Sequence, residues 1–368
     1  MAALLQYIYD TLCLYLVSLI QTLFPSYHAL YKPETEHMDK EPEKPADDTP
    51  EPDQYQPKVK DVLEVKQFLI EKCKLPPELS DIVIDFAEYW PHTTNITSYN
   101  PIDLPHIRSG IGHENRFLLR SWPLGYIPSD SKFETTSIDK VVKQSTQLSP
   151  CPLPDNETSS KEAFENWTRS SMPRGEFACR KIIFTLKSHD QGWGGDYADK
   201  GTYRGSFTWF DFGLEKVSVS QKHPGEDVAV TEPPVIDTEK PADMSSAVDY
   251  EIRTILPRTV NGPNHTPEEP QYRFEHPLLP ARNVLQKNRT AERYTQEHVV
   301  TWSWNDNILP ESLDGNNLEQ EGRGRDTATG EFVRNMKIGD VVTVWGKARF
   351  PGWVNIVDRV QIDVYWAV

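Results

Sequence analysis

Two loops of this chain contain the residues whose types and spacing are best suited to chemistry. The first, within SHDQGWGGDYADKGTYRGS (188–206), contains His189, Asp190, Gln191, Trp193 and Tyr203. The second, ARFPGWVN (348–355), adds Arg349, Trp353 and Asn355. If the loops lie side by side, their rings can stack on a sugar or another planar ligand, and Arg349 can pair with Asp190 or with a ligand carboxylate. These eight residues are the predicted ligand-binding site.

The same residues also have a purely structural interpretation. Four glycines at 192, 194, 195 and 201 permit turns with positive φ, and polar side chains at the base of a loop can cap strand ends. The sequence leaves both interpretations open.

Signatures of catalysis are weak. His189-Asp190 has no Ser or Cys nucleophile nearby, and no GxGxxG, P-loop or HExxH pattern occurs. The four cysteines at 13, 73, 151 and 179 lie far apart without histidines at ligand spacing. We predict no metal and no cofactor, and we favour a binding protein over an enzyme. An enzyme using His189 or Asp190 as acid or base is the alternative.

The elements that must position these loops are β-strands. Alternating or continuous apolar residues predict strands within 117–125, 179–188, 206–219, 299–305, 340–350 and 357–368. In the last, Val360, Ile362, Val364 and Trp366 alternate with polar residues up to Val368. Well-separated strands without helical patterns between them predict a mainly β protein, an antiparallel jelly-roll-like β-sandwich over 101–368 with indole rings sealed between its layers.

Helical patterns occupy the region before the strands. Residues 58–74 and 76–90 predict a helical hairpin, broken at Pro76-Pro77, in a unit spanning 58–100. The segment PHTTNITSYNPIDLP (91–105) is predicted to be a loop. LPPELSDIVIDFAEYW (75–90) also resembles the start of an F-box, which implies an adaptor that grips a ubiquitin-ligase partner. A plain hairpin is the favoured alternative.

Composition excludes whole classes of function. The chain has 368 residues, a formal net charge of −16, 37% apolar residues and a mean hydropathy of −0.60. It is therefore not a polytopic membrane protein, and the acidic balance argues against nucleic-acid binding. Residues 33–57 predict a disordered acidic, Pro-rich linker, and a second insertion of this kind is predicted at about 221–270.

The first 32 residues form a separate unit, in which residues 2–24 predict an amphipathic helix. Three uses stay open: packing on protein, including self-association; lying on a membrane surface; and spanning a bilayer. The four widely separated cysteines predict a cytoplasmic protein, with association to a membrane through residues 2–24 as an open alternative. Five Asn-x-Ser/Thr triplets, at Asn95, Asn156, Asn166, Asn264 and Asn288, leave secretion as an alternative.

Three blocks resemble an uncharacterised fungal protein family. They are LPxEL…AEYW, SxDQGW…GTYxxSxTWF and the C-terminal ARFPGWxNxVxxVxIxVYWAV, and the resemblance covers roughly 58–220 and 298–368. This resemblance implies a common fold but no biochemical mechanism. The strand pattern also resembles a galactose-binding-type jelly roll, by analogy alone.

Together these observations predict a non-catalytic binding or scaffolding protein with a protein or small-molecule partner. Its contact surface is expected at loops 188–205 and 348–355. A lectin-like module or an enzyme acting on a carbohydrate or other small ligand at the same corner is the first alternative. An F-box-like adaptor is the second.

Overall fold

The computed structural model describes residues 56–110, 112–128, 142, 150–151, 168–221 and 248–368. The chain divides into two compact units, Met1–Pro91 and His92–Val368. The N-terminal segment 2–24, the acidic linker up to residue 55 and residues 222–247 of the predicted insertion lie outside the described residues. Within the described ranges, no helix combines the length and the apolar character that crossing a bilayer requires.

The first unit contains the predicted helical hairpin, with α2 at Val59–Glu71 and α3 at Pro77–Phe86. Asp61 accepts a hydrogen bond from the Lys58 backbone N–H at the start of α2, and Pro77 occupies the first turn of α3. An ion pair between Lys66 and Asp81 (2.6 Å) joins the helices.

The buried face of α3 is only partly apolar. Ser80, Val83 and Ile84 are buried, whereas Leu79 and Ile82 are both 48% exposed. Burial of Ser80 is permitted because its hydroxyl donates to the Pro76 carbonyl oxygen (3.2 Å). The helix therefore presents apolar side chains to solvent that a simple hydrophobic-face argument places in the core.

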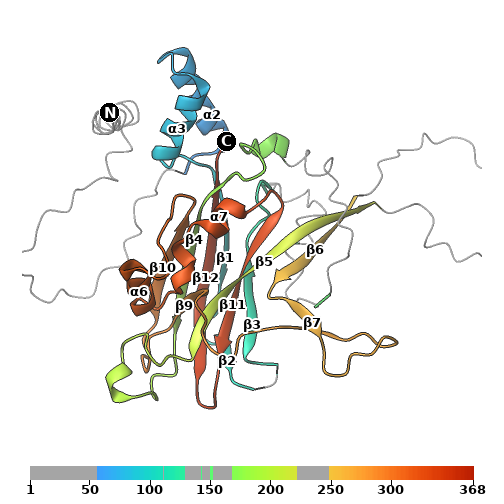
Figure 1. Ribbon diagram of the computed structural model, residues 1–368, viewed down its shortest axis with the longest axis vertical. Coiled ribbons are helices and arrows are strands. Elements are labelled where there is room, and N and C mark those ends of the chain that lie inside the picture. The colour runs from blue at the N-terminus through green and yellow to red at the C-terminus, as the bar shows by residue number, and fades with distance from the viewer. Residues whose placement is uncertain (1–55, 111, 129–141, 143–149, 152–167, 222–247) are drawn as a thin grey trace, which may run out of the picture. The chain divides into compact units, whose positions relative to one another are not determined.

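The second unit is an antiparallel β-sandwich, which confirms the predicted fold class (Figure 1). One sheet has the order β1-β12-β4-β10, with β2 beside β12, and the other has the order β3-β11-β5-β6, with β9 beside β5. The chain crosses repeatedly between the sheets, as in a jelly roll. The strands are β1 His92–Ser98, β2 His106–Arg108, β3 Asn115–Arg120, β4 Cys179–His189, β5 Thr208–Gln221, β6 Val248–Leu256, β7 Thr259–Asn261, β8 Tyr272–Phe274, β9 Val284–Lys287, β10 Gln296–Ser303, β11 Asp340–Ala348 and β12 Val354–Trp366.

Short helices occupy two of the connections. The 3₁₀ turn η2 (Tyr197–Asp199) lies between β4 and β5, and α6 (Leu313–Gln320), η3 (Arg325–Ala328) and α7 (Glu331–Asn335) lie between β10 and β11. Phe332 of α7 packs on Trp302 (5.2 Å between ring centroids) and on Phe212 (5.0 Å), so α7 covers part of the apolar core.

The core between the sheets follows the alternation read from the sequence. Val360, Ile362 and Val364 of the central strand β12 are at most 1% exposed. Across the sandwich, Phe212 of β5 meets Trp302 of β10, with ring centroids 4.7 Å apart. The C-terminal strand thus buries one face in the core, and its alternating pattern predicts such a half-buried strand.

Two predictions about loops are wrong. Residues 92–98 form β1, which pairs with β12 from His92↔Tyr365 to Ser98↔Arg359. Their β-branched residues favour an extended backbone, and an available edge of β12 completes the hydrogen bonding. The boundary between the units accordingly falls at Pro91 rather than near residue 100.

The second wrong prediction concerns the insertion expected at 221–270. Its part from Val248 to Leu256 is strand β6, paired with β5. Tyr250 and Ile252 pack against a buried cluster that includes Val217 and Val341. Alternating apolar residues in an otherwise polar segment explain why this part joins the sheet.

Strand β11 of the second sheet is buried on both faces, which the sequence did not indicate. Val344 pairs with Phe212 and so faces the interior, and Trp345 and Lys347 therefore face outwards on β11. Trp209 has the opposite parity to Phe210 and Phe212, so it also lies on the outer face. The sequence predicted that the indole rings of the β-sandwich are sealed between its two sheets. This prediction is wrong for Trp209 and Trp345. They are covered instead by loops outside the sheet.

Candidate functional site

The two loops singled out in the sequence meet at one end of the sandwich (Figure 1). The loop after β4 reaches the β11–β12 turn through Gln191, whose side-chain oxygen accepts a hydrogen bond from the Val354 backbone N–H (2.9 Å). The Gln191 amide nitrogen also donates to the Trp193 carbonyl oxygen (2.5 Å). Gln191 therefore fixes the conformation of its own loop and attaches that loop to the neighbouring turn.

The β11–β12 connection is a tight turn with specific backbone requirements. The Trp353 N–H donates to the Phe350 carbonyl oxygen (3.3 Å), with Pro351 and Gly352 between them. Gly352 has φ +91°, as the third residue of a type II turn requires. Phe350 itself has φ +65°, an unfavourable value for a residue with a side chain.

Trp193 lies directly on this turn. A Cβ atom added at Gly352 would be 3.0 Å from the Cη2 atom of the Trp193 ring. A Cβ atom added at Gly195 would lie 3.9 Å from the Trp353 ring. The absence of a side chain at Gly352 is what lets the loop and the turn approach so closely, whereas at Gly195 an added Cβ would clash with Thr290 (2.7 Å).

Four side chains form an aromatic surface here, which we call the aromatic corner: Trp193, Phe207, Phe350 and Trp353. The Phe207 ring makes edge contacts with Phe350 (4.7 Å between centroids) and with Trp353 (5.2 Å). Trp193 is 62% exposed and Phe350 is 41% exposed, while Phe207 and Trp353 are half-buried. The corner thus combines solvent-exposed rings with a rigid aromatic base.

Asp190 stands below this surface and holds the loops in place. Its side chain is fully buried, and its two oxygens accept hydrogen bonds from the backbone N–H groups of Gly192 (2.7 Å) and Ala291 (2.6 Å). Burial raises the pKa of Asp190 to about 6, against the opposing effect of the backbone N–H groups. The neighbouring His189 ring shares a hydrogen bond with the Asp190 carbonyl oxygen (2.7 Å). With both carboxylate oxygens occupied, Asp190 anchors the loop rather than facing a ligand.

Arg349 does not reach Asp190 or the aromatic corner. It is 4% exposed, and its guanidinium group donates to the carbonyl oxygens of Glu114, Ala348 and Pro277 and to the Asn115 side chain, at 2.7–2.9 Å. The guanidinium also lies over the Trp209 ring, 5.2 Å from its centroid. The predicted pairing of Arg349 with Asp190 is thus not present.

Tyr203 and Asn355 are also engaged elsewhere. The Tyr203 hydroxyl hydrogen-bonds with the Nε2 atom of His298 (3.1 Å). Asn355 is fully buried and accepts a hydrogen bond from Asn288 (2.9 Å), which in turn accepts one from the Ser188 hydroxyl (2.7 Å). This buried network links β4 and β12 below the corner, and it leaves no polar atom of Asn355 facing solvent.

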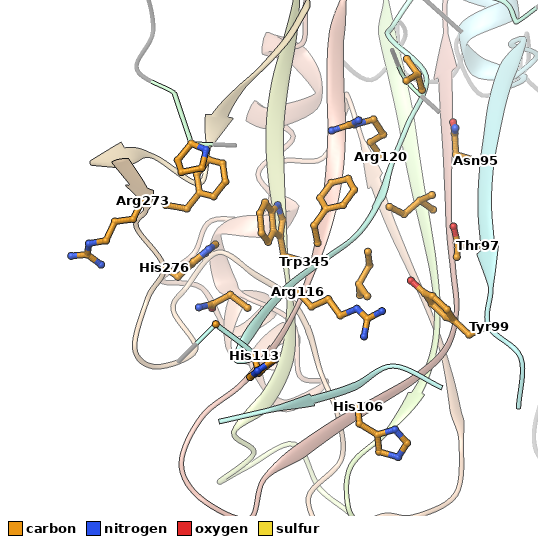
Figure 2. A pocket seen from close by; sticks show the side chains of 18 of the residues that line it. Asn95, Thr97, Tyr99, His106, His113, Arg116, Arg120, Arg273, His276 and Trp345 are labelled. Atoms are coloured by element: carbon orange, nitrogen blue, oxygen red, sulfur yellow. The ribbon is translucent and has the colours of Figure 1, made fainter. Parts of the chain in front are cut away.

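A second site was missed by sequence reasoning. A pocket of about 1150 Å³ lies on the outer side of β3, bounded also by β1, β8 and β11 (Figure 2). We call it the basic pocket, because its described lining residues include three arginines and three histidines: Arg116, Arg120, Arg273, His106, His113 and His276. The sequence did contain one indication of this site: Lys347 is a lysine within the apolar strand segment VVTVWGKA. The histidines come from separate segments, so no local pattern revealed the site.

Metal binding finds no support in the described part of the chain. No three His, Cys, Asp or Glu side chains there are grouped in a way that could hold a metal ion.

Comparisons of the chain with protein-family models, with curated proteins and with solved structures find no match. The resemblance to a fungal protein family therefore stays a prediction, and the site has to be interpreted from its geometry.

Proposed function

We propose that this protein is a non-catalytic binding module that contacts a protein partner through the aromatic corner. The observation that carries the proposal is that Trp193 is 62% exposed and yet packed on Gly352. An exposed indole that is already ordered loses little conformational entropy on binding, and tryptophan is among the residues that contribute most to protein interfaces.

Neighbouring residues support an extended contact surface. Tyr197 is 89% exposed in the same loop, and the Lys200 ammonium group lies 5.6 Å from its ring centroid. Aromatic rings with an adjacent cation are typical of interface centres with polar rims. Two anchors below them, the buried Asp190 and the half-buried Gln191, keep the loop in one conformation.

The same geometry argues against an acid/base role for Asp190. Asp190 is buried, and both of its carboxylate oxygens accept hydrogen bonds from backbone N–H groups. A general acid or base has to come within hydrogen-bond reach of the substrate atom. We therefore favour binding over catalysis.

The test compares Trp193→Ala with Leu309→Ala, which removes a 72% exposed apolar side chain elsewhere on the same unit. Proteins retained by each variant from cells that express the chain are quantified by mass spectrometry. A retained protein is then purified, and its Kd is measured by calorimetry. We expect Trp193→Ala to weaken binding by roughly 30-fold, as for a central interface residue, and Leu309→Ala to leave it unchanged. If no retained protein depends on Trp193, the proposal is wrong.

A lectin-like function of the same corner is the second candidate. Two indoles, Trp193 and Trp353, lie on one surface, and sugar rings bind proteins by stacking on such faces. A glycan array distinguishes the candidates: saturable glycan binding that is lost in Trp193→Ala supports a lectin, and a blank array leaves the protein partner as the sole candidate.

The adaptor function of residues 75–90 rests on a different surface. Leu79 and Ile82 of α3 are each 48% exposed, although α3 ends at Phe86 and strand β1 follows at His92. An F-box continues into further helices, so this resemblance covers only its beginning. Co-purification with a ubiquitin-ligase scaffold that is lost in Leu79→Glu/Ile82→Glu supports the adaptor. Its absence from the wild-type complex refutes it.

A further inference from the structure

The basic pocket is separate from the aromatic corner and has its own chemistry. Its volume of about 1150 Å³ is ample for a small ligand, since ligand pockets commonly enclose about 300–1,000 Å³. Figure 2 shows His276 on one side of Trp345 and Arg116 with Tyr99 on the other.

Charge in this pocket is opposite to that of the protein. The chain has a formal net charge of −16, yet none of the described residues that line the pocket is Asp or Glu. Arg120 is neutralised by Glu215 (2.9 Å), whereas Arg116 is exposed and has no carboxylate partner among the described residues. Behind the lining lie two buried cations and one largely buried carboxylate: Arg349, whose hydrogen-bond acceptors are uncharged oxygens, and Lys347, which pairs with Asp211 (3.7 Å). Such a site attracts an anion.

A directed hydrogen-bond donor lies at the inner end of the pocket. The Lys347 ammonium group lies 2.5 Å from the Nδ1 atom of His276 and also donates to Asn115 (3.1 Å). When Lys347 is protonated its ammonium group can only donate, so Nδ1 of His276 accepts and the hydrogen resides on Nε2. Burial and the charges of Lys347 and Arg349 lower the pKa of His276 to about 3, which keeps the ring in this neutral form.

Aromatic side chains supply a surface for a flat ligand between these groups. Trp345 makes edge contacts with Phe117 (5.5 Å between centroids) and Phe274 (5.6 Å), and both phenylalanines are half-buried. Tyr99 lines the pocket from the end of β1, next to Arg116. Planar molecules pack well against such rings.

We propose that the basic pocket binds a small planar molecule with one anionic group, a carboxylate or a phosphate. The anionic group contacts Arg116, the ring lies against Phe117 and Phe274, and an acceptor on the ligand takes the Nε2–H of His276. This recognition is independent of the partner bound at the aromatic corner.

Calorimetry on the full chain with four probes tests the proposal. The pair 2-naphthoate and 2-naphthamide differs in charge at nearly constant shape, and the pair adenosine monophosphate and adenosine shows the effect of the whole phosphate group. We expect at least one anion to bind with a Kd below about 1 mM and its neutral counterpart to bind about tenfold more weakly. The anion that binds identifies an aromatic acid or a nucleotide as the ligand class.

Arg116→Gln locates the binding, with Arg108→Gln as the matched control. Both arginines are exposed, and Arg108 lies on β2 but does not line the pocket, so the two variants change the net charge equally. The proposal predicts about a tenfold loss of affinity in Arg116→Gln and no change in Arg108→Gln. It is overturned if neither anion binds, if the neutral probes bind equally well, or if both variants behave alike.

Discussion

Substitution of Gly352 by alanine tests whether Trp193 is really seated on the β11–β12 turn. Two contributions to the loss of folding stability are expected. An alanine at φ +91° is strained, which costs about 1–2 kcal/mol. The new Cβ atom would also lie 3.0 Å from the Trp193 ring and force the ring to move.

The second cost can be bounded from the exposure of Trp193. The side chain is 62% exposed, so somewhat over a third of its surface is covered. For an aromatic side chain of up to about 250 Å², complete loss of that coverage costs up to about 2 kcal/mol. A shift of the ring without full release costs less, and about 1 kcal/mol is the expected value.

Gly175 is a matched control in the same unit. It has φ +84°, and a Cβ atom added there meets nothing within 4 Å. Gly175→Ala should therefore show the backbone cost alone, and Gly352→Ala should be less stable than it by about 1 kcal/mol.

Urea unfolding gives both free energies, and NMR gives an independent signal. The indole N–H resonance of Trp193, assigned with Trp193→Phe, should shift in Gly352→Ala and stay in place in Gly175→Ala. Equal destabilisation of the two variants, with no shift of this resonance, would refute the contact and with it the rigid seating on which the binding proposal rests.

Three further predictions concern buried polar groups. Asn288→Ala should destabilise the protein by about 2–4 kcal/mol in urea unfolding, because it leaves buried hydrogen-bond partners unpaired, whereas Asn264→Ala, at an exposed position, should have little effect. Burial lowers the pKa of Lys347 from 10.5 to about 7, so the unfolded chain binds more protons than the folded one between these values. Stability should accordingly rise by about 1 kcal/mol per pH unit from about pH 7 to pH 9, and this rise should vanish in Lys347→Met. Burial raises the pKa of Cys179 from 9.0 to about 12, which offsets the Lys347 contribution between about pH 9 and pH 10.5 and makes stability fall with pH above that range. The same burial should protect this thiol from iodoacetamide while the exposed cysteines react, as peptide mass spectrometry can show.

Most of the fold could be predicted from the strong strand patterns in the sequence. The alternation from Val360 to Trp366 predicted a half-buried strand, which β12 confirms, and β4 is confirmed with Ile182, Phe184 and Leu186 buried. Strand β1 was missed because PHTTNITS has few large apolar residues. Its extended conformation depends on pairing with β12, which follows more than 250 residues later in the chain, and no local pattern contains that information.

The candidate sites show the same division between local and non-local information. The glycines and aromatic residues of the two loops indicated an aromatic surface, and the structure places Trp193 beside the 348–355 turn. Arg349 and Asn355 are residue types that commonly bind ligands. Their side chains nevertheless point into the protein, where they form hydrogen bonds with buried carbonyl and amide groups.

The sequence by itself determined the class of the fold, the position of most strands and the two loops that contain exposed aromatic residues, because these properties follow from periodicity and turn chemistry within short windows. Only the tertiary structure decided which loop residues face solvent and where cations gather. The basic pocket combines His113, Arg116, His276 and Trp345 from distant segments, and such a site exists only when strand pairing brings those segments together.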